Sequence, residues 1–101
     1  MLLVSLLSAA LTVAQPIPQP AVLDAAATLA DPGEARRVVL DGRSWFCGSD
    51  GACVARGPGA SQPVLRECRR FVARFGPVTR YERDGVALTD EELARCNAAA
   101  A

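Results

Sequence analysis

The chain of 101 residues contains no histidine and no lysine, and aromatic residues make up only 5% of it. Without histidine, Ser-His and Cys-His nucleophiles are excluded and the commonest metal ligand is missing. We therefore expect no catalytic residues, no metal site and no cofactor. Arginine supplies every positive charge and the formal net charge is zero, so the excess of positive charge that favours nucleic-acid binding is also absent.

The chain also lacks an apolar run long enough to span a membrane, which takes about 20 residues. The uncharged segment Met1–Ala14 has the length of the apolar part of a signal peptide, although no charged residue precedes it. Small residues before Gln15 favour cleavage after Ala14, with Ala10 as the alternative site. A short buried helix is the other interpretation, but it would need a larger core than the rest of the chain provides. We expect an exported protein, periplasmic or secreted, that meets the membrane only through residues 1–14.

The composition divides the remainder into a leader, one domain and a tail. Residues 15–26 are rich in proline and alanine and are predicted to be an extended leader. Residues 27–97 are long enough for one small domain, and the alanines at 98–101 are predicted to be disordered. The stretch 21–30 fits a helix by its alanine content and a short strand by its ending, so its structure stays open.

Four cysteines in a short exported chain are typical of a disulfide framework. Three pairings are open, and we favour Cys47 with Cys53 and Cys68 with Cys96. The first pair brackets a short turn and the second joins two predicted helices. The intervals between the cysteines match neither structural zinc sites nor a redox-active Cys-x-x-Cys motif.

Two Asp-Gly pairs predict β-hairpins, because type I′ turns need a positive φ at both central residues. Asp41-Gly42 lies between residues 38–40 and 44–47, and Asp84-Gly85 lies between residues 78–83 and 86–88. In the first hairpin four side chains should share one face: Val38, Leu40, Trp45 and Cys47. A further short strand is expected at residues 52–56, followed by a loop at 57–62.

Residues 63–75 form the clearest predicted helix. Their apolar positions make one stripe: Val64, Cys68, Phe71, Val72 and Phe75. Glu67 and four arginines occupy the rest of the helix surface. A shorter helix should follow Thr89, with Glu92 completing a capping box and Leu93 and Cys96 facing inward. The predicted fold class is therefore α+β, with small antiparallel hairpins packed on one amphipathic helix, a short C-terminal helix and two disulfides.

Several short motifs resemble a family of small uncharacterised exported bacterial proteins. They are a tryptophan two residues before the first cysteine, four cysteines, Phe75-Gly76-Pro77-Val78, Gly85, Leu88 and the ending Leu93-Ala94-Arg95-Cys96-Asn97. The resemblance covers roughly residues 27–98 and implies a signal peptide but no activity. The chain departs from the family pattern at Asp41-Gly42, where a continuous strand would also fit.

The charged surface of the long helix is the one candidate site. It consists of Arg66, Arg69, Arg70 and Arg74, with the aromatic Tyr81 expected nearby, and it could bind phosphate groups or other anions. A solvated helix surface is the simpler interpretation. We expect a non-enzymatic structural or interaction protein whose partner is an envelope protein or an anionic envelope polymer. The alternative functions are a binder of anionic envelope ligands through these arginines and, third, a redox protein or other enzyme.

Overall fold

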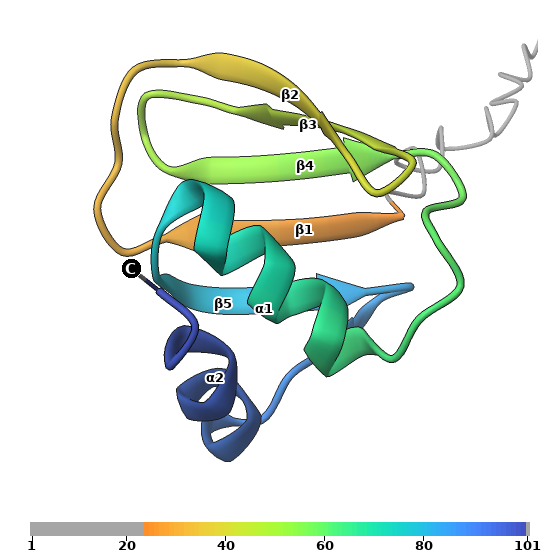
Figure 1. Cartoon of the computed structure of the whole chain (residues 1–101). Coiled ribbons are helices and arrows are strands. Elements are labelled where there is room, and N and C mark those ends of the chain that lie inside the picture. The colour runs from red at the N-terminus through yellow and green to blue at the C-terminus, as the bar shows by residue number, and fades with distance from the viewer. Residues whose placement is uncertain (1–23, 101) are drawn as a thin grey trace, which may run out of the picture.

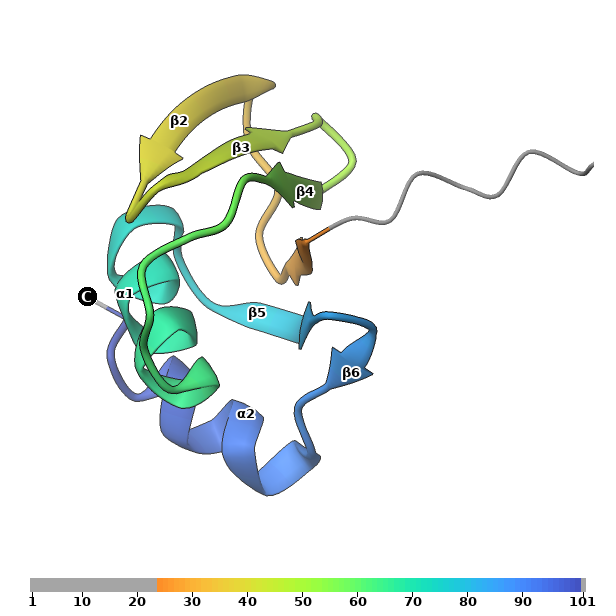
Figure 2. The same cartoon turned by 90° about the vertical axis from the view of Figure 1, so that its right-hand side faces the viewer.

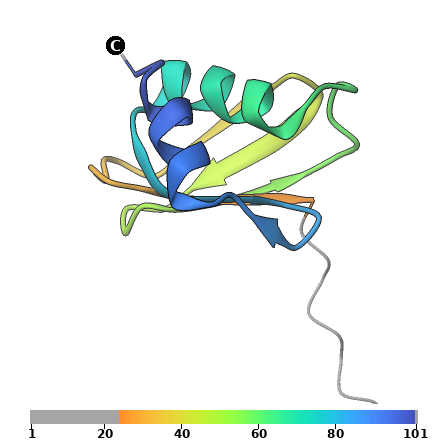
Figure 3. The same cartoon turned by 90° about the horizontal axis from the view of Figure 1, so that it is seen from below.

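The computed structural model describes residues 24–100, which form one sheet and two helices (Figure 1). Along the chain the elements are β1 Ala25–Leu29, β2 Arg36–Leu40, β3 Arg43–Cys47, β4 Ala52–Arg56, α1 Val64–Phe75, β5 Val78–Arg83, β6 Val86–Ala87 and α2 Asp90–Asn97. Figure 2 shows α1 and α2 beside each other, and Figure 3 shows both above the same face of the sheet. The predicted α+β class is confirmed.

Within the stretch 21–30, whose structure the sequence left open, Ala25–Leu29 form β1, an inner strand of the sheet. The strands are ordered β2-β3-β4-β1-β5-β6, and every neighbouring pair is antiparallel. Residues 25, 27 and 29 face the core, while 26 and 28 are half-buried. Pairing with β4 and β5 on both sides satisfies the backbone of β1, which outweighs the helix propensity of its alanines. Residues 25 and 26, which the composition assigns to the leader, belong to this strand.

Both Asp-Gly pairs form the predicted tight turns. In the first turn φ is 50° at Asp41 and 80° at Gly42. In the second turn φ is 54° at Asp84 and 80° at Gly85. Val38 lies directly opposite Trp45 in the β2–β3 pair, so the predicted shared face is confirmed. A continuous strand through residues 41 and 42 is thereby ruled out.

The core lies between the sheet and α1, and Trp45 is at its centre. Trp45 is 1% exposed, and its ring centroid lies 4.5 Å from that of Phe71 and 6.1 Å from that of Tyr81. The predicted apolar stripe of α1 faces this core, with Val64 at its partly buried end. Four of the five aromatic residues of the chain are therefore concentrated in one cluster, whereas Phe46 is exposed.

Both predicted disulfides are present. Cys47 and Cys53 are directly opposite each other on β3 and β4, with their Cα atoms 4.0 Å apart. Cys68 on α1 is bonded to Cys96 on α2 across a Cα distance of 5.7 Å. None of the four cysteines is free. The second bond fixes the short α2, which begins with the predicted capping box between Thr89 and Glu92.

Asn97 joins the end of α2 to the beginning of β5. Its side chain accepts a hydrogen bond from the Val78 N–H and donates one to the Val78 carbonyl oxygen, both at 2.8 Å. The motifs Gly-Pro-Val and Ala-Arg-Cys-Asn thus meet in space. The alanines at 98–100, expected to be disordered, continue from α2 in hydrogen-bonded turns, and Ala100 packs against the core. In the described range, neither helix has the length and hydropathy required to cross a membrane.

Candidate functional site

The structure places the four arginines of the predicted site on the exposed side of α1, and we call them the arginine face. Arg66, Arg69, Arg70 and Arg74 are all exposed, because the apolar stripe turns the opposite side of the helix toward the sheet. Tyr81 is not part of this surface, since its side chain is completely buried. The prediction that Tyr81 lies beside these arginines on the surface is therefore wrong.

One member of the arginine face is already paired with a carboxylate. Arg70 donates hydrogen bonds from Nε and Nη2 to the two oxygens of Asp41, at 2.6 and 3.1 Å. The hydrogen bond from Arg70 holds the pKa of Asp41 below its ordinary value. Within residues 24–100, Arg66, Arg69 and Arg74 make no ion pair. Three guanidinium groups thus remain available to an external anion.

A second cluster of charged residues, apart from the arginine face, is buried around Glu67 and was not predicted from the sequence. Glu67, expected on the solvated side of α1, is 4% exposed and points into the domain. Its Oε2 accepts a hydrogen bond from Arg43 Nε at 2.8 Å, and its Oε1 accepts one from the Tyr81 hydroxyl at 2.9 Å. Arg83 Nη1 lies 3.9 Å from the same Oε1. We call these four residues the Glu67 cluster.

The Glu67 cluster also controls the ionisation of its members. Burial opposes the charged form of Arg43, but the hydrogen bond to Glu67 and its negative charge outweigh burial and raise the pKa of Arg43. Burial, with the charge of Glu67 adding to it, raises the pKa of Tyr81 far above its ordinary value. Tyr81 therefore stays protonated and keeps donating to the carboxylate.

We expect Tyr81 to govern the stability of the domain at alkaline pH. An unfolded tyrosine loses its proton at about pH 10, whereas folded Tyr81 retains it. Above that pH, unfolding of the domain therefore releases a proton. The free energy of unfolding should then decrease by about 1.4 kcal/mol per pH unit. The chain has one tyrosine and no lysine, and its cysteines are bonded, so no other side chain titrates in this range.

Urea unfolding followed by the fluorescence of Trp45, at steps from about pH 8 to about pH 11, measures this slope. Tyr81→Phe should have a lower free energy of unfolding at neutral pH and no slope above about pH 10. An equal slope in the variant and the parent protein would contradict the assignment.

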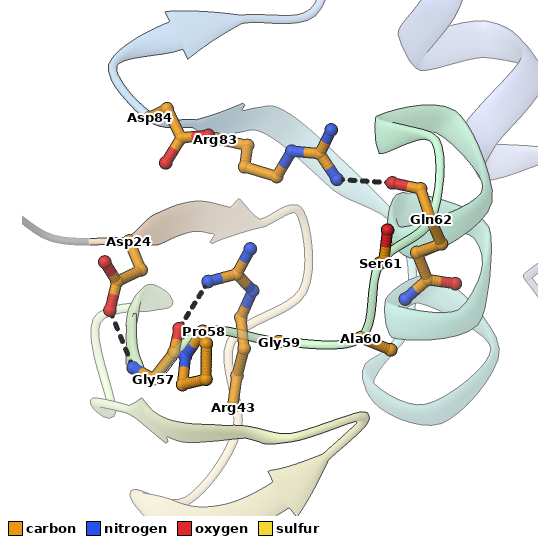
Figure 4. Close-up of a pocket in the computed structure, with 10 residues that line it drawn as sticks. All are labelled: Asp24, Arg43, Gly57, Pro58, Gly59, Ala60, Ser61, Gln62, Arg83 and Asp84. Carbon is orange, nitrogen blue, oxygen red and sulfur yellow. Dashed lines mark hydrogen bonds between the residues drawn. The ribbon is translucent and has the colours of Figure 1, made fainter.

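A cavity of about 400 Å³ lies beside the Glu67 cluster (Figure 4). It is lined by Asp24 before β1, Arg43 at the beginning of β3, the loop 57–62, and Arg83 and Asp84 at the end of β5. Arg43 Nη1 donates to the Gly57 carbonyl oxygen at 2.7 Å, and Arg83 Nη1 donates to the Gln62 carbonyl oxygen at 2.7 Å. The two arginines thus anchor both ends of the loop.

Two glycines let the loop lie close over the sheet. Gly57 has φ 113°, and a Cβ atom there would come within 2.7 Å of the Gly42 carbonyl oxygen. Gly59 has φ 68°, and a Cβ atom there would lie 2.9 Å from the guanidinium carbon of Arg43. The sequence predicted a loop at these positions but gave no sign that it covers a charged cavity.

Residues 24–100 contain no group of three or more cysteine, aspartate or glutamate side chains placed to hold a metal ion. The model of a family described as "Family of unknown function (DUF8200)" matches residues 5–98. The chain belongs to this family. The part of the DUF8200 match that the structure describes includes both disulfides, the Glu67 cluster and the contact of Asn97 with β5. No curated protein and no solved structure matches the chain.

Proposed function

We propose that this DUF8200 protein is exported and acts outside the cytoplasm as a non-enzymatic interaction domain. The observation that carries the proposal is that its four cysteines form two internal disulfides, with Cys68 and Cys96 completely buried. Such bonds persist in oxidising compartments and are rare in the cytosol. The apolar segment 1–14, which lies outside the described residues, supports export by its length and small residues.

The hydrogen bonds of the buried carboxylate of Glu67 support a role without catalysis. Both oxygens of Glu67 accept hydrogen bonds from buried partners, and the side chain is almost completely buried, so a substrate has little access to this carboxylate. General acid-base catalysis needs a titratable group within reach of the reacting atom. The chain also has no histidine to fill that role.

The arginine face supports a second and more specific function, the binding of an anionic envelope ligand. Four guanidinium groups extend from one side of one helix, and Asp41 neutralises one of them. Guanidinium groups bind phosphate, sulfate and carboxylate through paired hydrogen bonds. Because the remaining three lie within three turns of α1, an anionic polymer could contact them together.

This function predicts a specific loss of retention on an anionic matrix such as immobilised heparin. The triple variant Arg66→Gln, Arg69→Gln, Arg74→Gln should elute at clearly lower salt than the parent protein. It makes fewer ionic contacts with the matrix, so less salt is needed to screen them. The matched control is Arg37→Gln, Arg56→Gln, Arg80→Gln. These three exposed arginines are on the sheet face without helices, and removing them changes the net charge equally.

The control triple should elute close to the parent protein if α1 makes the contacts. Equal shifts in both triples would show that net charge alone governs retention. Unchanged elution of the α1 triple would rule out the arginine face as the binding surface.

A further inference from the structure

The cavity beside the Glu67 cluster contains hydrogen-bond donors that have no acceptor among residues 24–100. The side chain of Arg43 is 5% exposed; its Nε and Nη1 are bonded to Glu67 and Gly57, but none of the residues 24–100 accepts a hydrogen bond from its Nη2. Figure 4 shows this nitrogen pointing toward Arg83 across the cavity. Arg83 uses Nη1 for Gln62, and its Nη2 and Nε have no partner in the same part of the chain.

Charge at the base of the cavity points to a negatively charged ligand group. The two guanidinium groups of Arg43 and Arg83 share one buried carboxylate, that of Glu67. One positive charge is therefore not compensated within the cluster. The unpaired guanidinium nitrogens reach solvent in the cavity, and a ligand carboxylate placed between the two arginines would accept charge-assisted hydrogen bonds from both.

The rim of the cavity has the opposite charge. Asp24 and Asp84 lie side by side there, held together by a hydrogen bond from the Asp84 N–H to the Asp24 carbonyl oxygen at 3.1 Å. One carboxylate oxygen of Asp24 accepts the Gly57 N–H at 2.6 Å, and Asp84 is exposed. These carboxylates would repel a ligand that is only anionic, and they would attract an ammonium group.

From this arrangement we infer that the cavity binds a free α-amino acid in its zwitterionic form. The ligand carboxylate lies between Arg43 and Arg83, and the ligand ammonium group faces Asp24 and Asp84. The volume of about 400 Å³ is at the lower end of the range for small-molecule sites, which suits a ligand of this size. This site is separate from the arginine face and does not depend on its function.

Titration of the folded protein with L-alanine, acetate and methylammonium at constant ionic strength tests the inference. Amide resonances of Gly57, Gly59 and Gly85 in nitrogen-proton correlation spectra report on the loop and the rim. We expect L-alanine to give saturable shifts at these residues, with an affinity at least about tenfold higher than either half-ligand. Equal affinity for acetate and L-alanine, or no saturable shift, would overturn the inference.

Asp84→Asn is the most informative variant, because asparagine tolerates the positive φ of 54° and preserves the turn. It should weaken L-alanine binding about tenfold while leaving acetate binding equal or stronger. The matched control is Asp50→Asn, in the turn between β3 and β4, which should bind both probes like the parent protein. Unchanged L-alanine affinity in Asp84→Asn would contradict the role of the rim.

Arg83→Gln should abolish binding of both L-alanine and acetate, whereas its control Arg80→Gln, on the same strand, should retain both. If Arg83→Gln does not fold, the comparison of Asp84→Asn with Asp50→Asn decides alone. The Arg66, Arg69, Arg74 triple should bind L-alanine normally, so failure of the arginine face and failure of the cavity remain distinguishable.

Discussion

Replacing Glu67 by glutamine is expected to lower the free energy of unfolding by about 3 to 5 kcal/mol, since the change leaves a buried cation without its counterion. The side chain of Arg43 is 5% exposed and has this carboxylate as its acidic partner among residues 24–100. Glutamine keeps the shape of the side chain but removes the charge that raises the pKa of Arg43. Urea unfolding at neutral pH, followed by Trp45 fluorescence, measures the loss.

The control for this prediction is Glu91→Gln on α2. Glu91 also pairs with an arginine, Arg95, at 2.6 Å, but both side chains are mostly exposed. Exposed pairs contribute little because water screens them. A similar loss in both variants would show that the Glu67 cluster is no more important than a surface ion pair.

The second large effect is expected on removal of the bond between Cys68 and Cys96. In the chain-entropy model, closing this loop stabilises the fold by about 3.6 kcal/mol, against about 2.3 kcal/mol for the shorter loop between Cys47 and Cys53. A domain of this size has a total stability of only about 5 to 15 kcal/mol. The double variant Cys68→Ala, Cys96→Ala should therefore unfold at lower denaturant than Cys47→Ala, Cys53→Ala, by a difference of about 1.3 kcal/mol in the free energy of unfolding.

Loss of this bond should affect α2 more than the sheet. The helix is eight residues long, and Cys96 is its one fully buried residue. A helix of this length is marginal alone. Protection of the α2 amides from hydrogen exchange should decrease in the Cys68, Cys96 variant while that of β3 and β4 persists. A greater loss of stability from the Cys47, Cys53 variant would contradict this account.

Local sequence signals predicted the elements and the crosslinks well. Each Asp-Gly pair specified its hairpin because few residues other than glycine, asparagine and aspartate adopt a positive φ. The spacing of Val64, Cys68 and Phe71 specified the buried side of α1. The favoured cysteine pairing is also confirmed: Cys47 and Cys53 bracket a short turn, and Cys68 and Cys96 lie on the two predicted helices.

The position of β1 could not be predicted from such signals. Its alanines fit a helix or a strand, and only the long-range pairing with β4 and β5 decides between them. The cavity depends on that choice, because inserting β1 between these strands places Asp24 beside Arg83 and Asp84. A site built from four distant segments was therefore not visible in the sequence.

The position of Glu67 in the sequence does indicate that its side chain is buried, but a search for apolar residues alone misses it. Glu67 is three residues after Val64 and four before Phe71, so it lies on the same side of the helix as the apolar stripe. An acid at such a position needs a buried cation. Arg43, two residues before Trp45 in the first hairpin, lies on the same side of β3 and supplies that cation.

Formation of both disulfides after export is the central property proposed for this protein. Intact mass with thiol alkylation, before and after reduction, measures this directly on protein recovered from the envelope or medium of an expressing cell. We predict a chain that begins at Gln15 and takes up alkyl groups on its four cysteines only after reduction. Cysteines that react without reduction, or a protein that stays in the cytosol with residues 1–14 attached, would contradict the account.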